Sequence, residues 1–195
     1  MKLFTTDKEE AIVRKLSRGD ATAIDLLYAA YAPYLTAVCA RYIPRKDDMK
    51  DVLQEAFIKM FSNASGFNYR GKGSLKAWAT RIVINESLLF LRRIATSGMV
   101  FTDKDLPDQT DETPDVSTLN AEEITAMIGR LPPGYRMVFN LYVVEGMSHQ
   151  QISELLGIKV DTSASQLHKA KAMLARMIKE HRKQQELVSV GRPRP

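Results

Sequence analysis

The chain has one cysteine and three histidines, and this scarcity excludes several classes of function. A single thiol can form neither an intramolecular disulfide nor a cysteine-based metal cluster, and Cys39 lies among apolar residues, as buried and unreactive cysteines do. The histidines, His149, His168 and His181, stand singly in helical patterns without metal-ligand spacing, and no phosphate-binding loop is present. We therefore expect no cofactor and no metal, and an enzyme is the weakest interpretation.

Long hydrophobic runs are also scarce. The N-terminal sequence MKLFTTDKEEAIV has no apolar core of signal-peptide length. The longest weakly polar stretch, residues 26–40, contains Pro33 and is expected to be too short to cross a bilayer. These features predict a cytoplasmic protein. No alternating strand pattern occurs and helical periodicity dominates, so the expected fold class is all-α.

The net charge of +5 is distributed in three blocks. Residues 1–94 carry 16 Lys and Arg against 10 Asp and Glu (+6), and residues 95–120 carry one against six (−5). Residues 121–195 carry 11 against seven (+4). Two basic blocks thus flank an acidic connector. Basic blocks favour a polyanionic partner, although a mildly basic protein is not by itself evidence for one.

The acidic block also has the composition of a linker, since it is polar and contains prolines. The sequence thus predicts two small helical domains, residues 1–95 and 119–184, joined by a flexible linker at 96–118 and followed by a disordered tail at 185–195. Asp20 is expected to cap an early helix that Pro33 kinks or restarts. The later helices are predicted at residues 47–62, 74–95 (with Ser74 as cap), 118–130, 132–145, 148–156 and 161–180.

Residues 148–171, SHQQISELLGIKVDTSASQLHKAK, predict a helix-turn-helix. Gly157 suits a left-handed C-cap, Ile158 can enter the core, and Asp161 or Thr162 can cap the second helix. The second helix of such a motif enters the major groove of DNA. His149, after the cap Ser148, is expected at the surface.

A helical projection of residues 161–178 separates a core side from a polar outer side. The core side is expected to hold Ala164, Leu167, Ala170, Leu174, Met177 and Ile178, with Lys171 as a misfit that must extend its amine to solvent. The small Ala172 on the outer side would let the helix lie close to DNA. The candidate duplex-binding residues are Thr162, Ser165, Gln166, His168, Lys169 and Arg176. A merely solvated face is an equal alternative for this helix taken alone.

The helix predicted from Ser74 carries a second nucleic-acid signal. Trp78, Arg81, Asn85 and Arg92 share one stripe, and the preceding loop interleaves aromatic with basic residues. This arrangement suits unstacked, single-stranded bases. Alternatively, Trp78 belongs to the core and the loop aromatics are anchors. The candidate residues are Phe67, Asn68, Tyr69, Arg70, Lys72, Trp78, Arg81, Asn85 and Arg92.

The helix predicted at residues 47–62 has a different outer face. Its core stripe should be Val52, Leu53, Ala56, Phe57 and Met60, which leaves acidic and amide side chains and an isoleucine outside. Such a face would repel DNA, so it favours a protein partner over a nucleic acid, with a solvated surface as the alternative. The candidate protein-binding residues are Asp51, Gln54, Glu55 and Ile58.

The ordered motifs DVLQEAFIKMF, GSLKAWATRIVINESLLFLRR, LPPGYRMVFNLYVVEGMSHQQISELLGI and TSASQLHKAK resemble sigma factors of the extracytoplasmic-function (ECF) group over residues 10–180. These are two-domain bacterial initiation factors. The resemblance implies that Asp51–Glu55 bind the clamp helices of core RNA polymerase. It implies that residues 67–93 melt the promoter −10 element and capture a flipped base.

The resemblance further implies that Leu131-Pro132-Pro133 opens the region that reads the −35 element with the helix from Asp161. The acidic connector is expected to run near the polymerase active-site channel, and an anti-sigma protein is the expected regulator. Two departures occur: Asp161-Thr162 stands where Gly-Thr is common, and Asn85-Glu86-Ser87 where Asn-x-Ala is common. We expect Glu86 to lie off the stripe of Trp78.

Two other functions compete with this interpretation. A repressor or activator could use the helix-turn-helix as a dimer without polymerase, but the basic loop at residues 67–73 would then have no role. A protein-interaction adaptor would explain the acidic face, but not the two basic faces.

Overall fold

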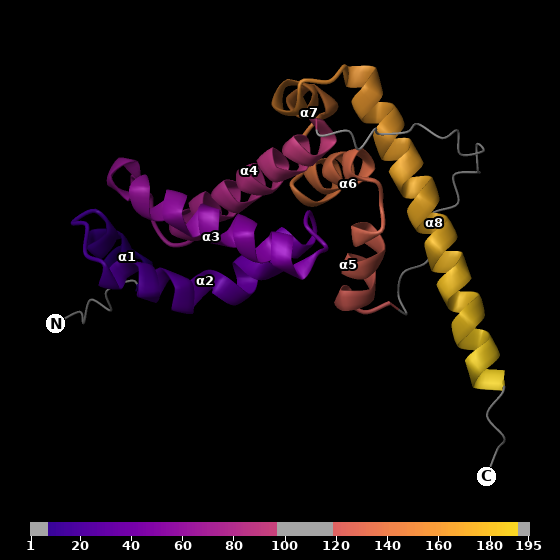
Figure 1. Cartoon of the computed structure of the whole chain (residues 1–195), viewed down its shortest axis with the longest axis horizontal. Helices are drawn as coiled ribbons and strands as arrows, with labels where there is room; N and C mark the ends of the chain where they lie inside the picture. Colours follow the sequence, from indigo (N-terminus) through magenta and orange to yellow (C-terminus); the bar gives the residue numbers. More distant parts are fainter. Residues whose placement is uncertain (1–7, 97–118, 191–195) are drawn as a thin grey trace, which may run out of the picture. The chain divides into compact units, whose positions relative to one another are not determined.

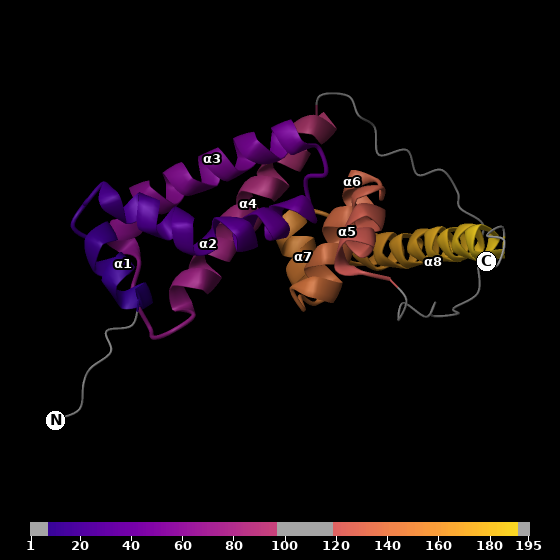
Figure 2. The same ribbon diagram turned by 90° about the horizontal axis from the view of Figure 1, so that it is seen from below.

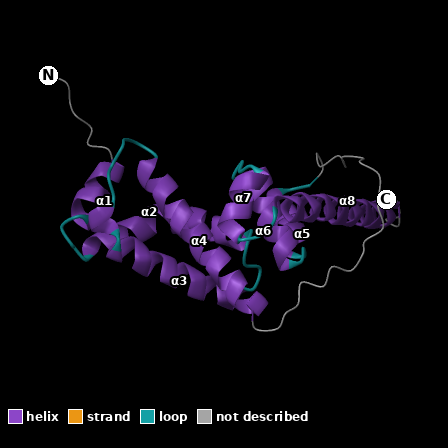
Figure 3. Cartoon of the chain, turned by 90° about the horizontal axis from the view of Figure 1, so that it is seen from above, coloured by secondary structure: helices purple, strands orange, loops and turns teal. Residues whose placement is uncertain are grey.

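The computed structural model of the protein describes residues 8–96 and 119–190, and the chain forms two compact units (Figure 1). Unit 1 comprises residues 1–98 and unit 2 residues 99–195. The regular structure in the described ranges is helical and includes no strand (Figure 3). The predicted all-α class with two helical domains is confirmed, while most of the predicted linker lies outside the described residues.

Unit 1 is a helical bundle in which α2, α3 and α4 pack against one another (Figure 2). Its α3 buries Val52, Ala56, Phe57 and Met60, as the predicted stripe requires, with Leu53 at the edge of the core. The bundle thereby turns the opposite side of each long helix to solvent. The elements are α1 (Lys8–Leu16), α2 (Thr22–Ala40), α3 (Lys46–Ser62), the 3-10 turn η1 (Ala64–Gly66) and α4 (Ser74–Thr96).

The α2 helix continues through Pro33, which is exposed, so the predicted restart does not occur. The side chain of Asp20 accepts hydrogen bonds from the backbone N–H (2.9 Å) and the hydroxyl (2.7 Å) of Thr22. These bonds lower the pKa of Asp20, because they favour the ionised carboxylate. Asp20 thus stabilises the start of α2, although Ala21, and not Asp20 as predicted, occupies the N-cap position.

By length and composition alone, α2 could cross a membrane, because the helix begins four residues before the stretch at 26–40 that was expected to be too short. The buried core helix of a bundle passes the same test. Leu27, Leu35 and Cys39 are 0% exposed within unit 1. The apolar side of α2 therefore serves the core of this unit.

The short helix α1 was not predicted from the sequence. It packs against α2 and η1 through Ile12 and Leu16, which are almost fully buried. Glu9 shares this buried side, although it is acidic. The i, i+3, i+7 spacing of these three residues is the helical signal that the sequence contains.

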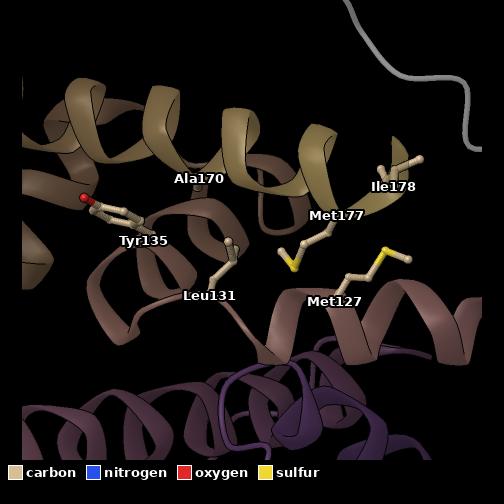
Figure 4. Packing of buried hydrophobic residues seen from close by; sticks show 6 residues of the cluster. All are labelled: Met127, Leu131, Tyr135, Ala170, Met177 and Ile178. Atoms are coloured by element: carbon tan, nitrogen blue, oxygen red, sulfur yellow. The ribbon is translucent and has the colours of Figure 1, made fainter. Parts of the chain in front are cut away.

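Unit 2 has its core between α8 and the two helices that precede the helix-turn-helix. The side chains of Met127, Leu131 and Tyr135 face Ala170 and Met177 of α8 (Figure 4). This packing holds one side of α8 and leaves the other open. The elements are α5 (Ala121–Gly129), α6 (Pro133–Phe139), the π-helix η2 (Asn140–Val144), α7 (His149–Leu156) and α8 (Val160–Val190).

The chain between α5 and α7 departs from the single helix predicted at residues 132–145. The α-helix ends at Phe139, and a π-helical turn follows from Asn140. Asn140 is fully buried, and its amide donates to the carbonyl of Arg136 at 3.0 Å. This side-chain bond competes with the regular backbone pattern, which is how such residues disturb helices.

Arg136 is itself buried, at 5% exposure, and its guanidinium donates to the carbonyl of Gly129 at 2.6 Å. Burial lowers the pKa of Arg136 to about 10, so the side chain stays charged at neutral pH. A cation bonded to the carbonyl at the end of α5 satisfies that carbonyl and complements the helix dipole. This contact fixes the turn between α5 and α6.

The C-terminal helix is longer than predicted. The sequence suggested a helix ending near residue 180 and a disordered tail from 185, but α8 continues to Val190. Residues 181–190 contain neither glycine nor proline, so no residue there breaks the helix; the next breakers are Gly191 and Pro193. The prediction is therefore wrong for residues 185–190, and residues 191–195 lie outside the described part.

Cys39 is expected to resist thiol reagents while unit 1 is folded. It is 0% exposed with its sulfur 3.7 Å from the hydroxyl of Ser87, and burial raises the pKa of the thiol to about 11. At pH 8, iodoacetamide should modify the native chain far more slowly than the chain in urea, as measured by intact mass. Because the unfolded thiol ionises at lower pH, stability should also fall as pH rises from 9 towards 11. Equal labelling rates in both states would contradict this account.

Candidate nucleic-acid and protein interfaces

The outer face of α3 presents the acidic and amide side chains as expected. Asp51, Gln54, Glu55 and Ile58 are all exposed, Ile58 at 48%. The neighbouring Lys59 is turned to α4, where it binds Glu86 at 2.7 Å. The exposed face of α3 around Glu55 therefore keeps its acidic character, with one apolar side chain beside it.

The stripe predicted on α4 is also present. Arg81, Asn85 and Arg92 are exposed, and Trp78 is partly buried on the same side. Glu86 lies off this stripe: its side chain is only 11% exposed and is engaged by Lys59 of α3. The expectation that Glu86 leaves the stripe unobstructed agrees with this geometry.

The loop between η1 and α4 lies against the first residues of the stripe. The ring of Phe67 packs on that of Trp78 with centroids 4.8 Å apart and planes tilted by 38°. Both rings remain partly exposed, as does Tyr69, so Phe67 anchors the loop without burying Trp78 in the core. The polar loop residues, Asn68, Arg70 and Lys72, are exposed. Aromatic and cationic groups are thus accessible together, as a single-strand binding surface requires.

Hydrogen bonds fix the end of this loop. Gly71 and Gly73 have φ of +105° and +92°, a region that L side chains rarely adopt. The hydroxyl of Ser74 donates to the carbonyl of Gly71 (2.6 Å) and accepts from the N–H of Arg70 (3.2 Å), so Ser74 binds the loop and does not act as the predicted cap. The N–H of Gly73 donates to Glu9 at 2.6 Å, a contact that the sequence did not reveal.

The turn between α7 and α8 has the predicted geometry. Ser148 caps α7 in a reciprocal capping box with Gln151. Gly157 is left-handed with φ of 68°, and its N–H donates to the carbonyl of Ser153 at 2.8 Å. The hydroxyl of Ser153 in turn donates to the carbonyl of Ile158 at 2.7 Å. These hydrogen bonds fix the turn that joins the two helices of the motif.

The α8 helix begins one residue earlier than expected. Its first residue is Val160, and the N–H of Ser163 donates to the carbonyl of Lys159 at 3.1 Å. Lys159 thus occupies the capping position, and the prediction that Asp161 or Thr162 caps the helix is wrong. Asp161 lies in the first turn, where its charge still complements the helix dipole.

A buried hydrogen bond ties α8 to α7. Ser163 is 0% exposed, and its hydroxyl lies 2.9 Å from the Nδ1 atom of His149, whose ring stacks on Tyr142 at 4.5 Å. Ala164, expected on the core side, is exposed instead. The projection misplaced these residues because a serine with a bonding partner can be buried. His149 is likewise a partly buried contact residue and not the simple surface residue expected.

The outer side of α8 carries the predicted duplex-binding set. Ser165, His168 and Arg176 are exposed, whereas Thr162, Gln166 and Lys169 are partly exposed. Arg176 pairs with Glu180 at 3.4 Å, but both side chains are 56% exposed, and such surface pairs are weak enough to exchange for a phosphate. Lys171, expected within the apolar stripe, is exposed.

The described residues contain no group of three or more His, Cys, Asp or Glu that could hold a metal ion. His181, for example, lies 3.2 Å from Glu123 of α5 and 2.8 Å from Gln185 within α8.

Both units are similar to parts of one protein family. Residues 27–96, in unit 1, match the model of sigma-70 region 2, and residues 121–174, in unit 2, match that of sigma-70 region 4. Together the two matches cover α3, α4, α7 and the first half of α8.

Curated relatives cover most of the chain. The ECF RNA polymerase sigma-E factor of Haemophilus influenzae is 28% identical over 182 residues, which is 87% of this chain and 95% of that protein. The RNA polymerase sigma-H factor of Pseudomonas aeruginosa is 28% identical over 181 residues, 87% of this chain and 93% of that protein. Among solved structures, the sigma factor RpoE in complex with the anti-sigma factor NepR from Bartonella quintana is 19% identical, covers 86% of this chain and 98% of that chain, and has a TM-score of 0.46.

Replacing Ser163 by Ala should destabilise unit 2, because it leaves the buried side of His149 without its partner. A loss of about 1–3 kcal/mol in the free energy of unfolding is expected. Ser165→Ala, on the exposed side of the same helix, is the matched control and should change stability by less than about 0.5 kcal/mol. Urea unfolding followed by circular dichroism measures both, and equal effects of the two substitutions would exclude the structural role of the His149 contact.

Proposed function

The chain belongs to the sigma-70 family, in its extracytoplasmic-function group, and we propose that particular helix faces of its two units divide promoter recognition between them. It is a transcription initiation factor that binds core RNA polymerase and promoter DNA and directs promoter-specific initiation. The observation that carries it is the separation of two polar, partly basic faces onto different units, with an acidic face on α3.

Unit 1 is proposed to bind the −10 element as a single strand. The rings of Phe67 and Trp78 offer partly exposed aromatic surfaces on which an unstacked base can lie. Arg81 can neutralise phosphates along the same stripe, and Asn85 can bond a base edge. Exchanging base stacking for aromatic contacts offsets the cost of melting, which is about a few kcal/mol per flipped base. The full set is Phe67, Asn68, Tyr69, Arg70, Lys72, Trp78, Arg81, Asn85 and Arg92.

Unit 2 is proposed to bind the −35 element as a duplex through the outer side of α8. The helix-turn-helix geometry supports this role, because the turn at Gly157 and the buried bond to Ser163 hold α8 on α7 with its polar side exposed. The proposed contacts to phosphates and base edges are Thr162, Ser165, Gln166, His168, Lys169 and Arg176.

The acidic face of α3, comprising Asp51, Gln54, Glu55 and Ile58, is proposed to bind core polymerase. Two exposed carboxylates oppose contact with DNA phosphates, while an isoleucine exposed at 48% suits a protein surface. An anti-sigma protein is the proposed regulator, following the family resemblance. If it covered Ile58, it would compete with polymerase for the same face.

We propose that the chain acts in the cytoplasm, where transcription takes place, and that it acts by binding and not as an enzyme. RNA synthesis would then belong entirely to the polymerase, and the factor would supply promoter selection and strand separation.

The first test of the proposed function is run-off transcription with core RNA polymerase from the same bacterium. The 5′ ends of transcripts from fragmented genomic DNA should reveal start sites that need this chain and share two motifs at a fixed spacing. A chain that binds duplex DNA specifically but adds no start site would instead be a repressor or activator.

The double substitution Trp78→Ala/Arg81→Ala should impair promoter opening much more than −35 binding. Loss of one stacked base alone costs about 1–3 kcal/mol, or about 5- to 150-fold. Permanganate reactivity of −10 thymines measures opening, and a −35 duplex probe measures the second activity. Lys76→Ala is the control, since Lys76 lies over Tyr34 on the opposite side of α4. Equal loss of both activities would contradict the division between the units.

The double substitution Lys169→Ala/Arg176→Ala should weaken −35 duplex binding and flatten its salt dependence. Each lost phosphate contact reduces the slope of log K against log salt concentration by about 0.9. Lys171→Ala removes an exposed lysine from another side of the same helix and should leave the slope unchanged. Fluorescence anisotropy at several salt concentrations measures the slopes, and an unaltered slope in the double variant would refute the phosphate role.

A further inference from the structure

Glu9 of α1 is a buried acid bonded to two distant segments of unit 1. It is 8% exposed, one carboxylate oxygen accepts from the hydroxyl of Tyr31 in α2, and the other accepts from the N–H of Gly73; both distances are 2.6 Å. Gly73 is 64 residues away in the sequence and is the last residue before α4. The carboxylate thus joins α1 to the end of the loop that carries the proposed −10 contacts.

The packing of α1 does not by itself require a buried carboxylate. Ile12 and Leu16 already attach α1 to the bundle by apolar burial. Burying a carboxylate is unfavourable unless hydrogen bonds compensate it, and bonds to an ionised acceptor are the strong ones. The bond from Gly73 also places negative charge at the N-terminal end of α4, where the helix dipole favours it. The carboxylate therefore has a well-defined place relative to the loop and α4.

The contact acts on a backbone that few residues could adopt. Gly73 has φ of +92°, and a Cβ atom there would meet nothing within 4 Å, so the glycine is required by conformation and not by space. Its carbonyl accepts from the N–H of Ala77 at 2.9 Å, which connects it to the first turn of α4. The loop is thus held at its start by Phe67 on Trp78 and at its end by Glu9.

We propose that Glu9 is a positioning residue for −10 recognition. It does not touch DNA; it holds the end of the loop so that Arg70 and Lys72 are presented beside Trp78 when an unpaired strand arrives. The family match begins at residue 27 and so assigns no role to α1. This inference rests on the proposed single-strand binding by unit 1.

The test compares Glu9→Ala, Glu9→Gln and the control Glu10→Ala in full-length holoenzyme. Glu10 is the exposed neighbour and pairs at the surface with Arg14 at 3.3 Å. Promoter opening should fall at least about tenfold in Glu9→Ala, the factor expected for one lost charge-assisted hydrogen bond. Glu9→Gln should retain most of the promoter opening, because the amide oxygen can accept from Gly73 while the amide nitrogen donates to Tyr31. Glu10→Ala should behave as wild type.

Four further measurements separate positioning from general stability. Core-polymerase affinity, −35 duplex affinity and the thermal unfolding midpoint should change little in Glu9→Gln. In Glu9→Ala, hydrogen exchange should become faster in peptides from the 67–77 segment, while peptides from α3 keep their protection. If Glu9→Ala does not fold, Glu9→Gln still tests the proposal, because a neutral amide accepts a weaker hydrogen bond than a carboxylate. Its exchange should then rise slightly and only in the 67–77 segment, and unchanged exchange there would contradict the proposal.

Two outcomes would overturn the inference. Normal opening in a folded Glu9→Ala variant would show that the loop needs no such contact. A parallel fall of opening, core affinity and thermal stability would make Glu9 a stability residue only. Failure of the proposed function would give a different result. The Trp78→Ala variant would then open promoters as well as the wild-type chain does.

Discussion

The orientation of each candidate DNA-facing helix depends on the burial of its opposite, apolar side. In unit 1, Leu75, Ala79 and Val83 of α4 are completely buried. In unit 2, Leu167, Ala170 and Met177 of α8 are similarly enclosed. Removing this apolar area from water stabilises the packing, but the hydrophobic effect is non-directional and does not fix the exact orientation of a helix. Only a helix with one apolar side can turn a continuous polar stripe to solvent.

Buried polar contacts refine what apolar packing leaves loose. Hydrophobic contact tolerates small rotations and shifts, whereas a hydrogen bond to a buried group demands a particular distance and angle. Two hydrogen bonds provide such constraints. The bond between Gly73 and Glu9 lies at the start of α4, and the bond between His149 and Ser163 lies at the start of α8. Both lie where the chain passes from a turn into a candidate DNA-facing helix. A carboxylate or an imidazole placed there fixes the first turn, from which the rest of the stripe follows.

The candidate site could be predicted from the sequence wherever local periodicity determines exposure. Asp51, Glu55 and Arg81 are exposed as their helical positions require, and Gly157 is left-handed as its place after a helix requires. The sequence failed where a partner distant in the chain changed the preference of a residue. Ser163 is buried because His149 bonds it, and Ala164 is exposed as a result. The roles of these surfaces towards DNA and polymerase remain predictions that the chemistry of the side chains supports.

The sequence by itself determined the helical class, the two-domain organisation and the turn of the helix-turn-helix, because periodicity, capping residues and glycine conformations act within a few residues. The order of the motifs also indicated the family. Only the tertiary structure decided that α1 reaches the loop before α4 through Glu9, that Lys59 binds Glu86 away from the stripe, and that Ser163 faces inward. Those contacts join residues 14 to 64 positions apart, and the energy of such a contact depends on burial and distance, which no local pattern contains.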